Sequence, residues 1–377
     1  MTQKLVLLGA GHAHVHVLKS LTLLAPQPFD EVAVTLISPY ARQVYSGMLP
    51  GWVAGHYTLD ECVIPLQPLA AKAGVAFHQT AASTIDFSNN VIRCEDGHTV
   101  PFDLLSIDTG PVANLSIVAG LAEQAIPIRP IEVFIESVEK LAGIITLRHQ
   151  RGARTRVAFV GAGAGGVELA LAMQHRFRDQ NLGVTLISAA DTLPGNVGPR
   201  LARIMRERGI AVLAGQAASG VSSAGVQLVS GAVVDADIVI AAPGTSAAAW
   251  PRQSGLVTDK DGFILVNDKL QSVSHANVFA AGDCATIEHQ PRPRSGVYAV
   301  KAGPPLDDNL RRFLRGEPLR RYVPPSRSLN LISAGNKYAI GSWGSLGWEG
   351  SWVWQWKDAI DRRFIGKYSI DEARKEK

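Results

Sequence analysis

Cysteine is scarce in this chain. Among 377 residues there are three, Cys62, Cys94 and Cys284, and no two of them have the close spacing of a redox or metal-binding pair. A disulfide framework and a thiol-redox pair are therefore disfavoured for this protein. The scarcity fits a reducing compartment, so we expect a cytoplasmic location.

Three further signals are missing. No run of about 18 apolar residues occurs, so no segment is expected to span a membrane. No block of lysine or arginine occurs, and a net charge of +4 with a pI near 9.0 is too modest to indicate a nucleic-acid partner. Residues 4–9 already have the pattern of a first buried strand, which leaves no room for a signal peptide. The hydrophobic content of 46% is ample for the cores of two domains.

What is present begins with a glycine-rich turn, GAGHAH at residues 9–14. It follows an apolar strand at residues 4–8 and precedes a predicted helix at 12–24, and a second strand is predicted at 32–38. In such a strand–helix–strand unit the turn aims the N–H groups of the helix at a pyrophosphate. The stretch therefore predicts a nucleotide-binding turn.

The residues of this turn are expected to have different roles. His14 replaces the third glycine of the G-x-G-x-x-G pattern, which requires a wider separation of helix and strand. A metal site formed by the three histidines of the stretch is disfavoured, because residues two apart on a helix point about 200° apart and no carboxylate or cysteine is close in sequence. We therefore predict no metal. The residues predicted to contact the nucleotide are Gly9, Gly11, His12 and Ala13.

A second copy of the turn, GAGAGG, stands at residues 161–166 between predicted strands at 156–160 and 183–188. One glycine-rich turn is weak evidence, but two copies roughly 150 residues apart, each in this context, imply two dinucleotide sites. The glycines that complete the second pattern are Gly161, Gly163 and Gly166.

The acidic residue that binds the ribose is expected at the end of the second strand of each unit. Ser38 and Ser188 stand at those positions, so the choice between NADH and NADPH stays open. Ser38 is kept as a predicted cofactor contact.

A third signature follows a short strand near residues 277–281 and consists of Gly282 and Asp283. A carboxylate at a strand end can accept a hydrogen bond from a ribityl hydroxyl group of a flavin. The same pattern also occurs in plain turns, but together with the two glycine-rich turns it favours flavin binding.

This order of motifs resembles the flavoproteins of the pyridine nucleotide-disulfide oxidoreductase superfamily. Within it, the chain is most similar to the branch that contains type II NADH dehydrogenases and sulfide:quinone oxidoreductases. GAGHAHVHVL and SPYARQVYSGMLPGWVAGHY resemble the NADH dehydrogenase-like flavoproteins that are sometimes fused to selenophosphate synthetase. The resemblance implies an α/β fold with FAD in the first unit and a nicotinamide dinucleotide in the second.

The resemblance also implies the domain organisation. Thr109-Gly110 resembles the turn through which the chain leaves the FAD domain, and Pro243-Gly244 resembles its counterpart in the second domain. We expect two Rossmann-like domains, with the second inserted in the first and followed by a C-terminal hairpin-helix module. The expected bounds are 1–115 and 260–328 for the FAD domain, 152–258 for the NAD(P) domain and 329–377 for the C-terminal module, with 116–151 as a link.

Three further site predictions come from the resemblance. The loop at residues 45–61, which contains Pro50, corresponds to a segment that borders the flavin ring, although it could be a plain surface loop. Lys301 in KAG resembles a lysine of sulfide:quinone oxidoreductases and would stabilise the reduced flavin; the alternative is a solvated surface lysine. Glu168 matches a glutamate near the nicotinamide and quinone side; the alternative is an ordinary glutamate in the first turn of a helix.

Five of the seven tryptophans lie in the last 35 residues, between positions 343 and 356. A hairpin is predicted around Gly335-Asn336, and a helix from residue 351 would place Trp352, Trp356, Ile360 and Phe364 near one face. The segment resembles the one that leads into the membrane-docking helices of type II NADH dehydrogenases. Core packing or a homodimer contact is an equal alternative to peripheral contact with the cytoplasmic face of a membrane.

The predicted function is that of an FAD-dependent oxidoreductase that passes hydride from NAD(P)H to the flavin and electrons to a quinone-like acceptor. Thr109 and Gly110 join the predicted FAD contacts. One alternative is a flavoenzyme that oxidises sulfide, selenide or a related donor without nicotinamide. Another is a flavin-binding accessory protein of selenium metabolism without turnover.

Overall fold

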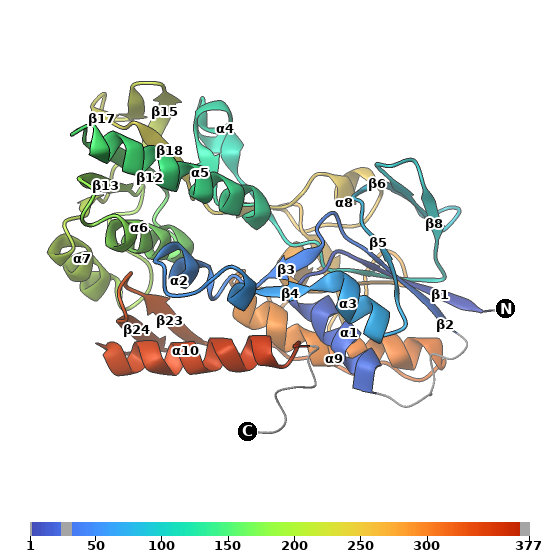
Figure 1. Ribbon diagram of the computed structural model, residues 1–377. Coiled ribbons are helices and arrows are strands. Elements are labelled where there is room, and N and C mark those ends of the chain that lie inside the picture. The colour runs from blue at the N-terminus through green and yellow to red at the C-terminus, as the bar shows by residue number, and fades with distance from the viewer. Residues whose placement is uncertain (1, 24–31, 370–377) are drawn as a thin grey trace.

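The computed structural model describes residues 2–23 and 32–369, and its first parallel sheet is built from two distant parts of the chain (Figure 1). The strand order is β21 (Val278–Ala280), β9 (Leu104–Ile107), β1 (Gln3–Leu8), β2 (Val32–Ile37) and β5 (Ala76–His78), and every neighbouring pair is parallel. The strands are short apolar runs with both faces covered, as expected for a parallel sheet. The edge strand β21 therefore follows the strands of the second sheet in sequence but pairs with β9 in the first sheet.

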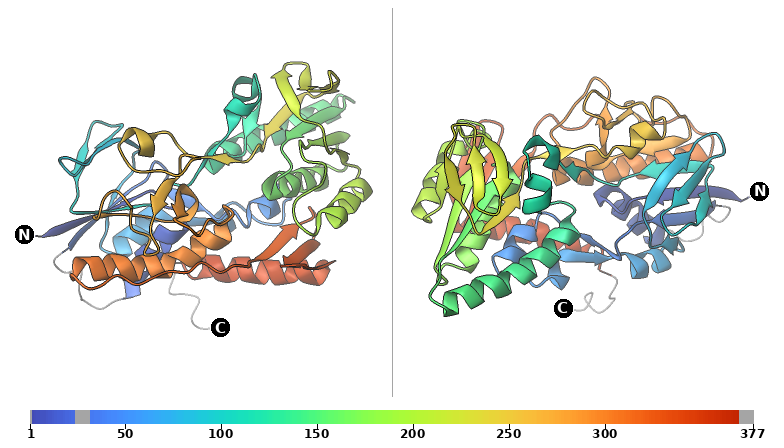
Figure 2. Two further views of the ribbon diagram at one scale, coloured as in Figure 1. Left: turned by 180° about the vertical axis from the view of Figure 1, so that it is seen from behind. Right: turned by 90° about the horizontal axis from the view of Figure 1, so that it is seen from above.

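Two helices pack against each other beside this sheet. They are α1 (His12–Leu23) and α9 (Gly296–Leu314), which lie side by side in both views (Figures 1 and 2). A Cβ atom at Gly303 would lie 2.7 Å from the Cβ atom of His16, so glycine is required for this close approach. The predicted end of the first helix, Leu24, lies outside the described residues.

The second parallel sheet has the order β11 (Ile126–Pro127), β18 (Ile238–Ala241), β12 (Thr155–Val160), β13 (Leu182–Ile187) and β14 (Ala211–Leu213). Its helices are α5 (Ile131–Gln150), α6 (Ala164–Arg176) and α7 (Gly198–Glu207). Both sheets therefore have the strand–helix–strand start that the glycine-rich turns predicted, and the predicted α/β fold with two Rossmann-like units is confirmed.

The chain passes twice between the two sheets, and the two passages pair with each other. β10 (Val112–Ala113) begins one residue after Thr109-Gly110, and β19 (Thr245–Ser246) follows Pro243-Gly244 directly. The two strands are antiparallel, with Val112 opposite Ser246 and Ala113 opposite Thr245. The segments through which the chain leaves the two units are therefore hydrogen-bonded to each other.

The C-terminal segment forms an antiparallel sheet and a long helix. The predicted hairpin is present as β23 (Leu329–Ser333) and β24 (Ala339–Trp343), with Gly335 at a φ of +84° between them. A third strand, β25 (Leu346–Gly350), pairs antiparallel with β24 and was not part of the predicted hairpin. The predicted helix is α10 (Ser351–Gly366), drawn in red along the lower edge in Figure 1.

The aromatic residues of α10 divide between interior and surface. Trp352, Trp356 and Ile360 are exposed, whereas Phe364 is buried against Tyr45. The expectation that all four lie on one face is therefore wrong for Phe364. A step of four residues advances about 40° around a helix, so three steps carry Phe364 about 120° away from Trp352. Among the described residues, no helix is long and apolar enough to cross a membrane.

The remaining described elements are short segments that connect or flank the two parallel sheets. They include antiparallel three-stranded sheets beside each parallel sheet, formed by β6–β8 and β15–β17. Their bounds are β3 (Arg42–Val44), α2 (Leu49–Val53), η1 (Asp60–Cys62), β4 (Val63–Pro65), α3 (Leu66–Lys72), β6 (Ala82–Asp86), β7 (Val91–Cys94), β8 (Thr99–Pro101), η2 (Leu115–Ile117), α4 (Leu121–Gln124), β15 (Ala218–Ser222), β16 (Gly225–Leu228), β17 (Val233–Asp235), α8 (Trp250–Gln253), β20 (Ile264–Val266), η3 (Gly282–Cys284) and β22 (Ala285–Ile287).

Candidate functional site

A cavity of about 400 Å³ lies where strands β1, β2 and β9 of the first sheet end. The carboxyl ends of parallel strands are where open α/β sheets bind their ligands. The cavity brings together most of the residues predicted for the first site, which come from four separate segments of the chain. These are Gly9, Gly11, His12, Ser38, Thr109, Gly110 and Asp283.

The two glycines of the first turn are required by the close approach of β9. Gly9 has a φ of +87°, and a Cβ atom there would lie 2.5 Å from the carbonyl oxygen of Asp108. A Cβ atom at Gly11 would overlap the carboxyl group of Asp108. Any side chain at either position would displace the turn from the strand end.

Asp108 itself occupies the amino end of α1. One of its carboxylate oxygens, Oδ2, accepts hydrogen bonds from the N–H groups of Ala13 at 2.8 Å and His14 at 3.0 Å. Burial raises the pKa of Asp108 to about 7, although these two N–H groups act in the opposite direction. The sequence analysis missed this residue. Its signal is an acidic residue directly before Thr109-Gly110 at a strand end.

His14 fills the position of the third glycine and is completely buried. Its Nδ1 atom donates to the carbonyl oxygen of Gly9 at 2.6 Å, and its Nε2 atom accepts from the hydroxyl group of Ser106 at 2.7 Å. This assignment follows because the carbonyl can only accept and burial lowers the pKa of His14 to about 4, which keeps the ring neutral. In the second turn a Cβ atom at Gly166 would overlap the carbonyl oxygen of Gly161. The first turn therefore has room for an imidazole where the second has none for a methyl group.

His12 presents an incompletely bonded ring to the cavity. Its Nε2 atom is buried and has no hydrogen-bond partner among the described residues. The ring contacts those of Tyr45 and Phe364, at centroid distances of 5.6 and 5.8 Å. Burial, and to a smaller extent the charge of Arg129, lowers the pKa of His12 to about 4. A buried polar atom without a partner is costly, so this atom fits a site that is completed by a bound group.

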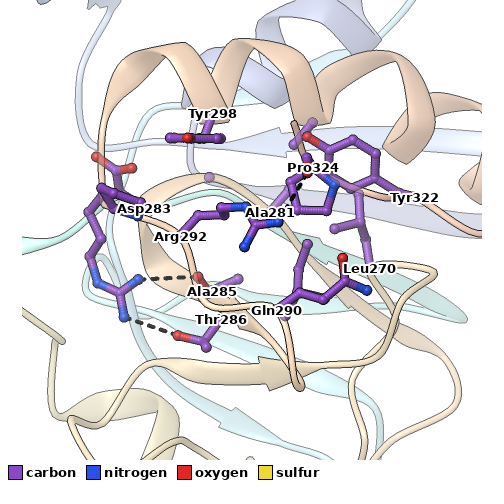
Figure 3. Close-up of a pocket in the computed structure, with 15 residues that line it drawn as sticks. Leu270, Ala281, Asp283, Ala285, Thr286, Gln290, Arg292, Tyr298, Tyr322 and Pro324 are labelled. Atoms are coloured by element: carbon purple, nitrogen blue, oxygen red, sulfur yellow. Dashed lines mark hydrogen bonds between the residues drawn. The ribbon is translucent and has the colours of Figure 1, made fainter. Parts of the chain in front are cut away.

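Asp283 lines both the large cavity and a smaller pocket, which Figure 3 shows with Tyr298 at its upper end and Thr286 at its lower end. Burial raises the pKa of Asp283, while the positive charges of Arg129 and Arg294 act in the opposite direction. Arg294 is held in place by Thr286, to which it donates at 3.0 Å. Gly282 lines the smaller pocket, and a Cβ atom there would overlap the carboxyl group of Asp108. The two carboxyl groups thus share one end of the cavity.

The second glycine-rich turn is open. Gly161 has a φ of +110°, and Gly163, Ala164 and Gly165 are exposed at the amino end of α6. A Cβ atom at Gly163 would meet nothing within 4 Å. Ser188 is buried and donates to the carbonyl oxygen of Ala190 at 2.9 Å. The first helix end therefore faces a cavity, and the second faces solvent.

A buried group of charged residues joins the segment after β3 of the first unit to α10. The Nζ atom of Lys357 lies 2.6 Å from Oδ2 of Asp361 and donates to the carbonyl oxygen of Gly47. The hydroxyl group of Tyr45 donates to Oδ1 of Asp361 at 3.1 Å. Because Gly47 and Tyr45 belong to the first unit, the Lys357–Asp361 pair fixes α10 to that unit.

Glu168 of α6 reaches the same region. Its Oε1 atom accepts a hydrogen bond from the N–H group of Ser333 in β23 at 2.8 Å. Burial raises the pKa of Glu168 to about 7, while Lys357 and the Ser333 N–H act in the opposite direction. The expectation of an ordinary exposed glutamate at a helix start is not met.

Other predicted residues lie apart from the cavity. Lys301 is exposed on α9 and does not line it, so its role beside the flavin stays a prediction. Pro50 is buried in α2 and does not line it either. Ala13 is buried and contributes its N–H group to Asp108. Two cationic residues that sequence analysis missed, Arg42 and Arg129, do line the cavity.

The cysteines and the first three histidines form no reactive site. Cys62, Cys94 and Cys284 are buried free thiols, and burial raises the pKa of both Cys62 and Cys284 to about 12. The histidines of the first turn do not converge, since His14 is bonded to Gly9 and Ser106 and only His12 lines the cavity. A catalytic thiol pair is therefore not formed by these residues.

Two Rossmann-like units with a flavin-type Gly-Asp signature define a class of dinucleotide-binding oxidoreductases. A family model described as pyridine nucleotide-disulphide oxidoreductase matches residues 3–303. The chain belongs to this family, whose cofactors are FAD and a nicotinamide dinucleotide. The predicted class, an FAD-dependent NADH dehydrogenase-like oxidoreductase, is confirmed.

Curated relatives share about a quarter of their residues with the chain. NADH dehydrogenase-like protein YutJ of Bacillus subtilis is 24% identical, covering 90% of this chain and 92% of that protein. Demethylphylloquinone reductase NdbB of Synechocystis is 24% identical over 88% of this chain and 85% of that protein. Ferroptosis suppressor protein 1 of Xenopus tropicalis is 28% identical over 49% of this chain, and the match spans only 52% of that protein.

Two solved structures have the same fold. NDH2 from Plasmodium falciparum in complex with NADH has a TM-score of 0.81 and 15% identity, covering 100% of this chain and 99% of that one. The sulfide:quinone oxidoreductase from Aquifex aeolicus has a TM-score of 0.80 and 19% identity, covering 97% of this chain and 91% of that one. The nearly equal scores show the fold and do not separate the two activities.

We expect Lys357→Met to lower the free energy of unfolding by about 3–5 kcal/mol, because it leaves the Asp361 carboxylate buried without its cation. The double variant Lys357→Met/Asp361→Leu should recover most of this loss, since no uncompensated charge is left. Arg178→Met is the matched control, because Arg178 pairs with Asp179 on the surface and should cost less than about 1 kcal/mol. Chemical denaturation of the four proteins measures these differences. Equal losses in the single and double variants would show that the pair does not fix α10.

Proposed function

We propose that this protein oxidises NAD(P)H and passes the electrons through FAD to a quinone-like acceptor. The observation that supports this most is the unequal access to the two glycine-rich turns. The first helix end faces a cavity lined by segments from four parts of the chain, which suits a resident cofactor. The second helix end is exposed, which suits a dinucleotide that binds and leaves at every turnover.

The residues of the first cavity fit FAD. The amino end of α1 and Arg129 supply positive potential for a pyrophosphate, His12 Nε2 offers an unused hydrogen-bonding atom, and Asp283 can accept from a ribityl hydroxyl group. When bound there, FAD supplies a two-electron acceptor that can return electrons one or two at a time. We propose that Gly161, Gly163 and Gly166 hold the pyrophosphate of the nicotinamide dinucleotide.

Glu168 is proposed to act as the general acid that supplies a proton during reduction of the acceptor. Its Oε1 atom is already bonded to the N–H group of Ser333, so Oε2 is the atom that would carry the proton. A carboxyl pKa near 7 allows the group to bind and release that proton at neutral pH. Lys357 and Asp361 position the surrounding segments. Lys301 is retained as a proposed contributor to flavin tuning, although it is exposed in the structure.

The division of the chain into domains is part of the proposal. Strands of the first sheet come from residues 3–107 and 278–280, which supports an FAD domain of 1–115 and 260–328 around the NAD(P) domain. The second sheet already begins at β11 (Ile126–Pro127), so part of the expected link 116–151 joins the NAD(P) domain that was expected at 152–258. Residues 329–377 would form the C-terminal module, of which 370–377 lie outside the described residues.

The second candidate is oxidation of sulfide or selenide without nicotinamide. It is favoured by the fold that the chain shares with sulfide:quinone oxidoreductase and by the resemblance of Lys301 to a lysine of those enzymes. Buried thiols with a raised pKa at Cys62 and Cys284 argue against covalent sulfur chemistry. An accessory role without turnover is the third candidate.

Anaerobic mixing of the purified flavoprotein with NADH, NADPH or sulfide tests the proposal. We expect the oxidised flavin absorbance to bleach with NADH or NADPH and to recover when a soluble quinone is added. Bleaching by sulfide alone would favour the second candidate. A flavin that responds to none of the three donors would favour the accessory role.

Glu168→Gln separates the two half-reactions in the same experiment. The variant should still bleach with NAD(P)H, whereas recovery with quinone should slow by about 10²-fold, the scale of general acid catalysis. Glu123→Gln, an exposed glutamate of α4, is the matched control and should behave as the unmodified protein.

Contact with a membrane surface is proposed for the C-terminal module. Trp343, Leu346, Trp352, Trp356 and Ile360 are exposed there, between 38% and 63%. The rings of Trp348, Trp352 and Trp356 stack on one another, with centroids 6.2 and 6.5 Å apart. Exposed aromatic clusters mark interaction sites, and Arg363 and Lys367 add positive charge nearby. The proposed location is therefore the cytoplasm, with peripheral contact at the cytoplasmic face of a membrane.

Vesicles of phosphatidylcholine and phosphatidylglycerol test this contact. We expect co-sedimentation that weakens as salt rises, because basic residues near an anionic surface contribute about 1 kcal/mol each. Trp352→Ser/Trp356→Ser should abolish binding with flavin retained, whereas Val229→Ser, a 70% exposed control on the second unit, should not. Loss of a dimer in size-exclusion chromatography, without any vesicle binding, would instead assign the tryptophans to an interface between two copies.

A further inference from the structure

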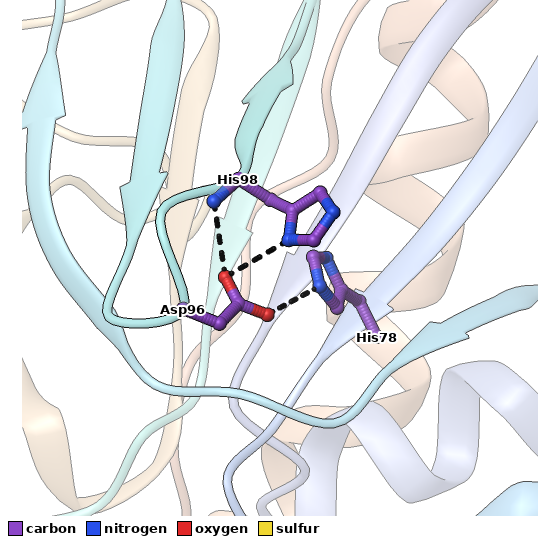
Figure 4. A group of neighbouring side chains, drawn as sticks. All are labelled: His78, Asp96 and His98. Atoms are coloured by element: carbon purple, nitrogen blue, oxygen red, sulfur yellow. Dashed lines mark hydrogen bonds and ion pairs between the residues drawn. The ribbon is translucent and has the colours of Figure 1, made fainter.

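Two histidines and one aspartate converge at the rim of the first sheet, away from the glycine-rich turns (Figure 4). His78 is the last residue of β5, the edge strand of the sheet. Asp96 and His98 lie in the tight turn between β7 and β8. Three potential ligands therefore come from two separate sheets.

The geometry of the three side chains is close to that of a metal site. Nε2 of His78 lies 2.8 Å from Oδ2 of Asp96, and Nδ1 of His98 lies 3.3 Å from Oδ1 of Asp96. The ligand atoms of all three residues lie within 4.8 Å of one another. Ligand atoms around a tetrahedral zinc ion lie about 3.3 Å apart, given metal–ligand bonds of about 2.0–2.1 Å. Small side-chain rotations would bring all three onto one ion.

The backbone holds the ligands in this arrangement. The N–H group of His98 donates to Oδ1 of Asp96 at 3.1 Å, which orients the carboxylate within its turn. The rings of His78 and His98 meet edge to face, with centroids 5.0 Å apart. The His98 side chain is 72% exposed, so an ion can reach the group from solvent and a water molecule can complete its coordination.

We propose that His78, Asp96 and His98 bind a divalent transition-metal ion of the zinc class. Two imidazole nitrogens and one carboxylate oxygen are ligands that suit zinc, nickel, copper and cobalt rather than magnesium or calcium. The ion would fix the β7–β8 turn to the edge of the first sheet. This inference does not depend on the electron-transfer activity.

The site is connected to the cavity through the backbone of β5. The carbonyl oxygen of His78 accepts a hydrogen bond from the N–H group of Ser38 at 3.2 Å, and Ser38 lines the cavity. Thr80, Ala81 and Ala82, which follow His78, line the same cavity. An ion at this position would therefore hold one wall of the cavity and raise the thermal stability of the FAD-loaded protein.

Calorimetric titration of the chelator-treated holoenzyme with Zn²⁺ tests the proposal, with Co²⁺ absorbance as a second readout. We expect saturable binding of one ion per chain, the visible absorbance of tetrahedral Co²⁺ and a rise in Tm with Zn²⁺. His98→Ala should weaken binding at least about tenfold and remove the rise in Tm. His289→Ala, an 88% exposed histidine elsewhere, is the matched control and should bind as the unmodified protein does.

Asp96→Asn keeps the size of the side chain and should also weaken metal binding. Weaker binding in this variant would show that the loss in His98→Ala is not merely an effect of altered packing. Retention of the flavin absorbance in every variant keeps this test separate from FAD binding. Absence of one-to-one binding, or equal affinity in the unmodified protein and His98→Ala, would overturn the proposal.

Discussion

The first site depends on one interaction, the bonding of the buried Asp108 carboxyl group to the amino end of α1. Two N–H groups of that helix are directed at it, and Gly11 and Gly282 have no side chains because the carboxyl group occupies the space. The pyrophosphate of a dinucleotide prefers the same helix end. Both groups can be accommodated when Asp108 is neutral, and its raised pKa means that it gains the proton near neutral pH. Proton binding at Asp108 and ligand binding are thus expected to be coupled.

The two glycine-rich turns differ in what occupies the end of the helix that follows each of them. In the first turn, His14 takes the place of a glycine and is held by Gly9 and Ser106, while Asp108 occupies the helix end. In the second turn, the glycine pattern is complete and the helix end is open to solvent. Between them, Lys357, Asp361 and Tyr45 fix α10 to the first unit, and Glu168 connects the second unit to β23. The arrangement suits the proposed resident flavin at the first turn and the proposed exchangeable donor at the second.

Local patterns in the sequence were sufficient for the first strands of each glycine-rich unit, the helix after the first turn, the C-terminal hairpin and helix, and most residues predicted for the first cavity. Gly9, Thr109 and Asp283 could be found because glycine-rich turns and strand ends leave short, specific signals. Arg42 and Arg129 could not, since they reach the cavity through tertiary packing that no spacing encodes. Phe364 differs from the other three residues of its stripe because three four-residue steps carry it about 120° from Trp352 and into the interior. The convergence of His78 with Asp96 and His98 depends on two sheets meeting, which only the structure reveals.

The central claim is most directly tested by equilibrium binding of FAD to the apoprotein between about pH 6 and 9, in the unmodified protein and in Asp108→Asn. Below pH 7 the neutral Asp108 should permit tight binding, and above it the ionised carboxylate should repel the pyrophosphate. The Kd of the unmodified protein should then rise by up to about tenfold per pH unit above the apoprotein pKa, whereas that of Asp108→Asn should stay nearly constant. The same pH dependence in both proteins would contradict the account.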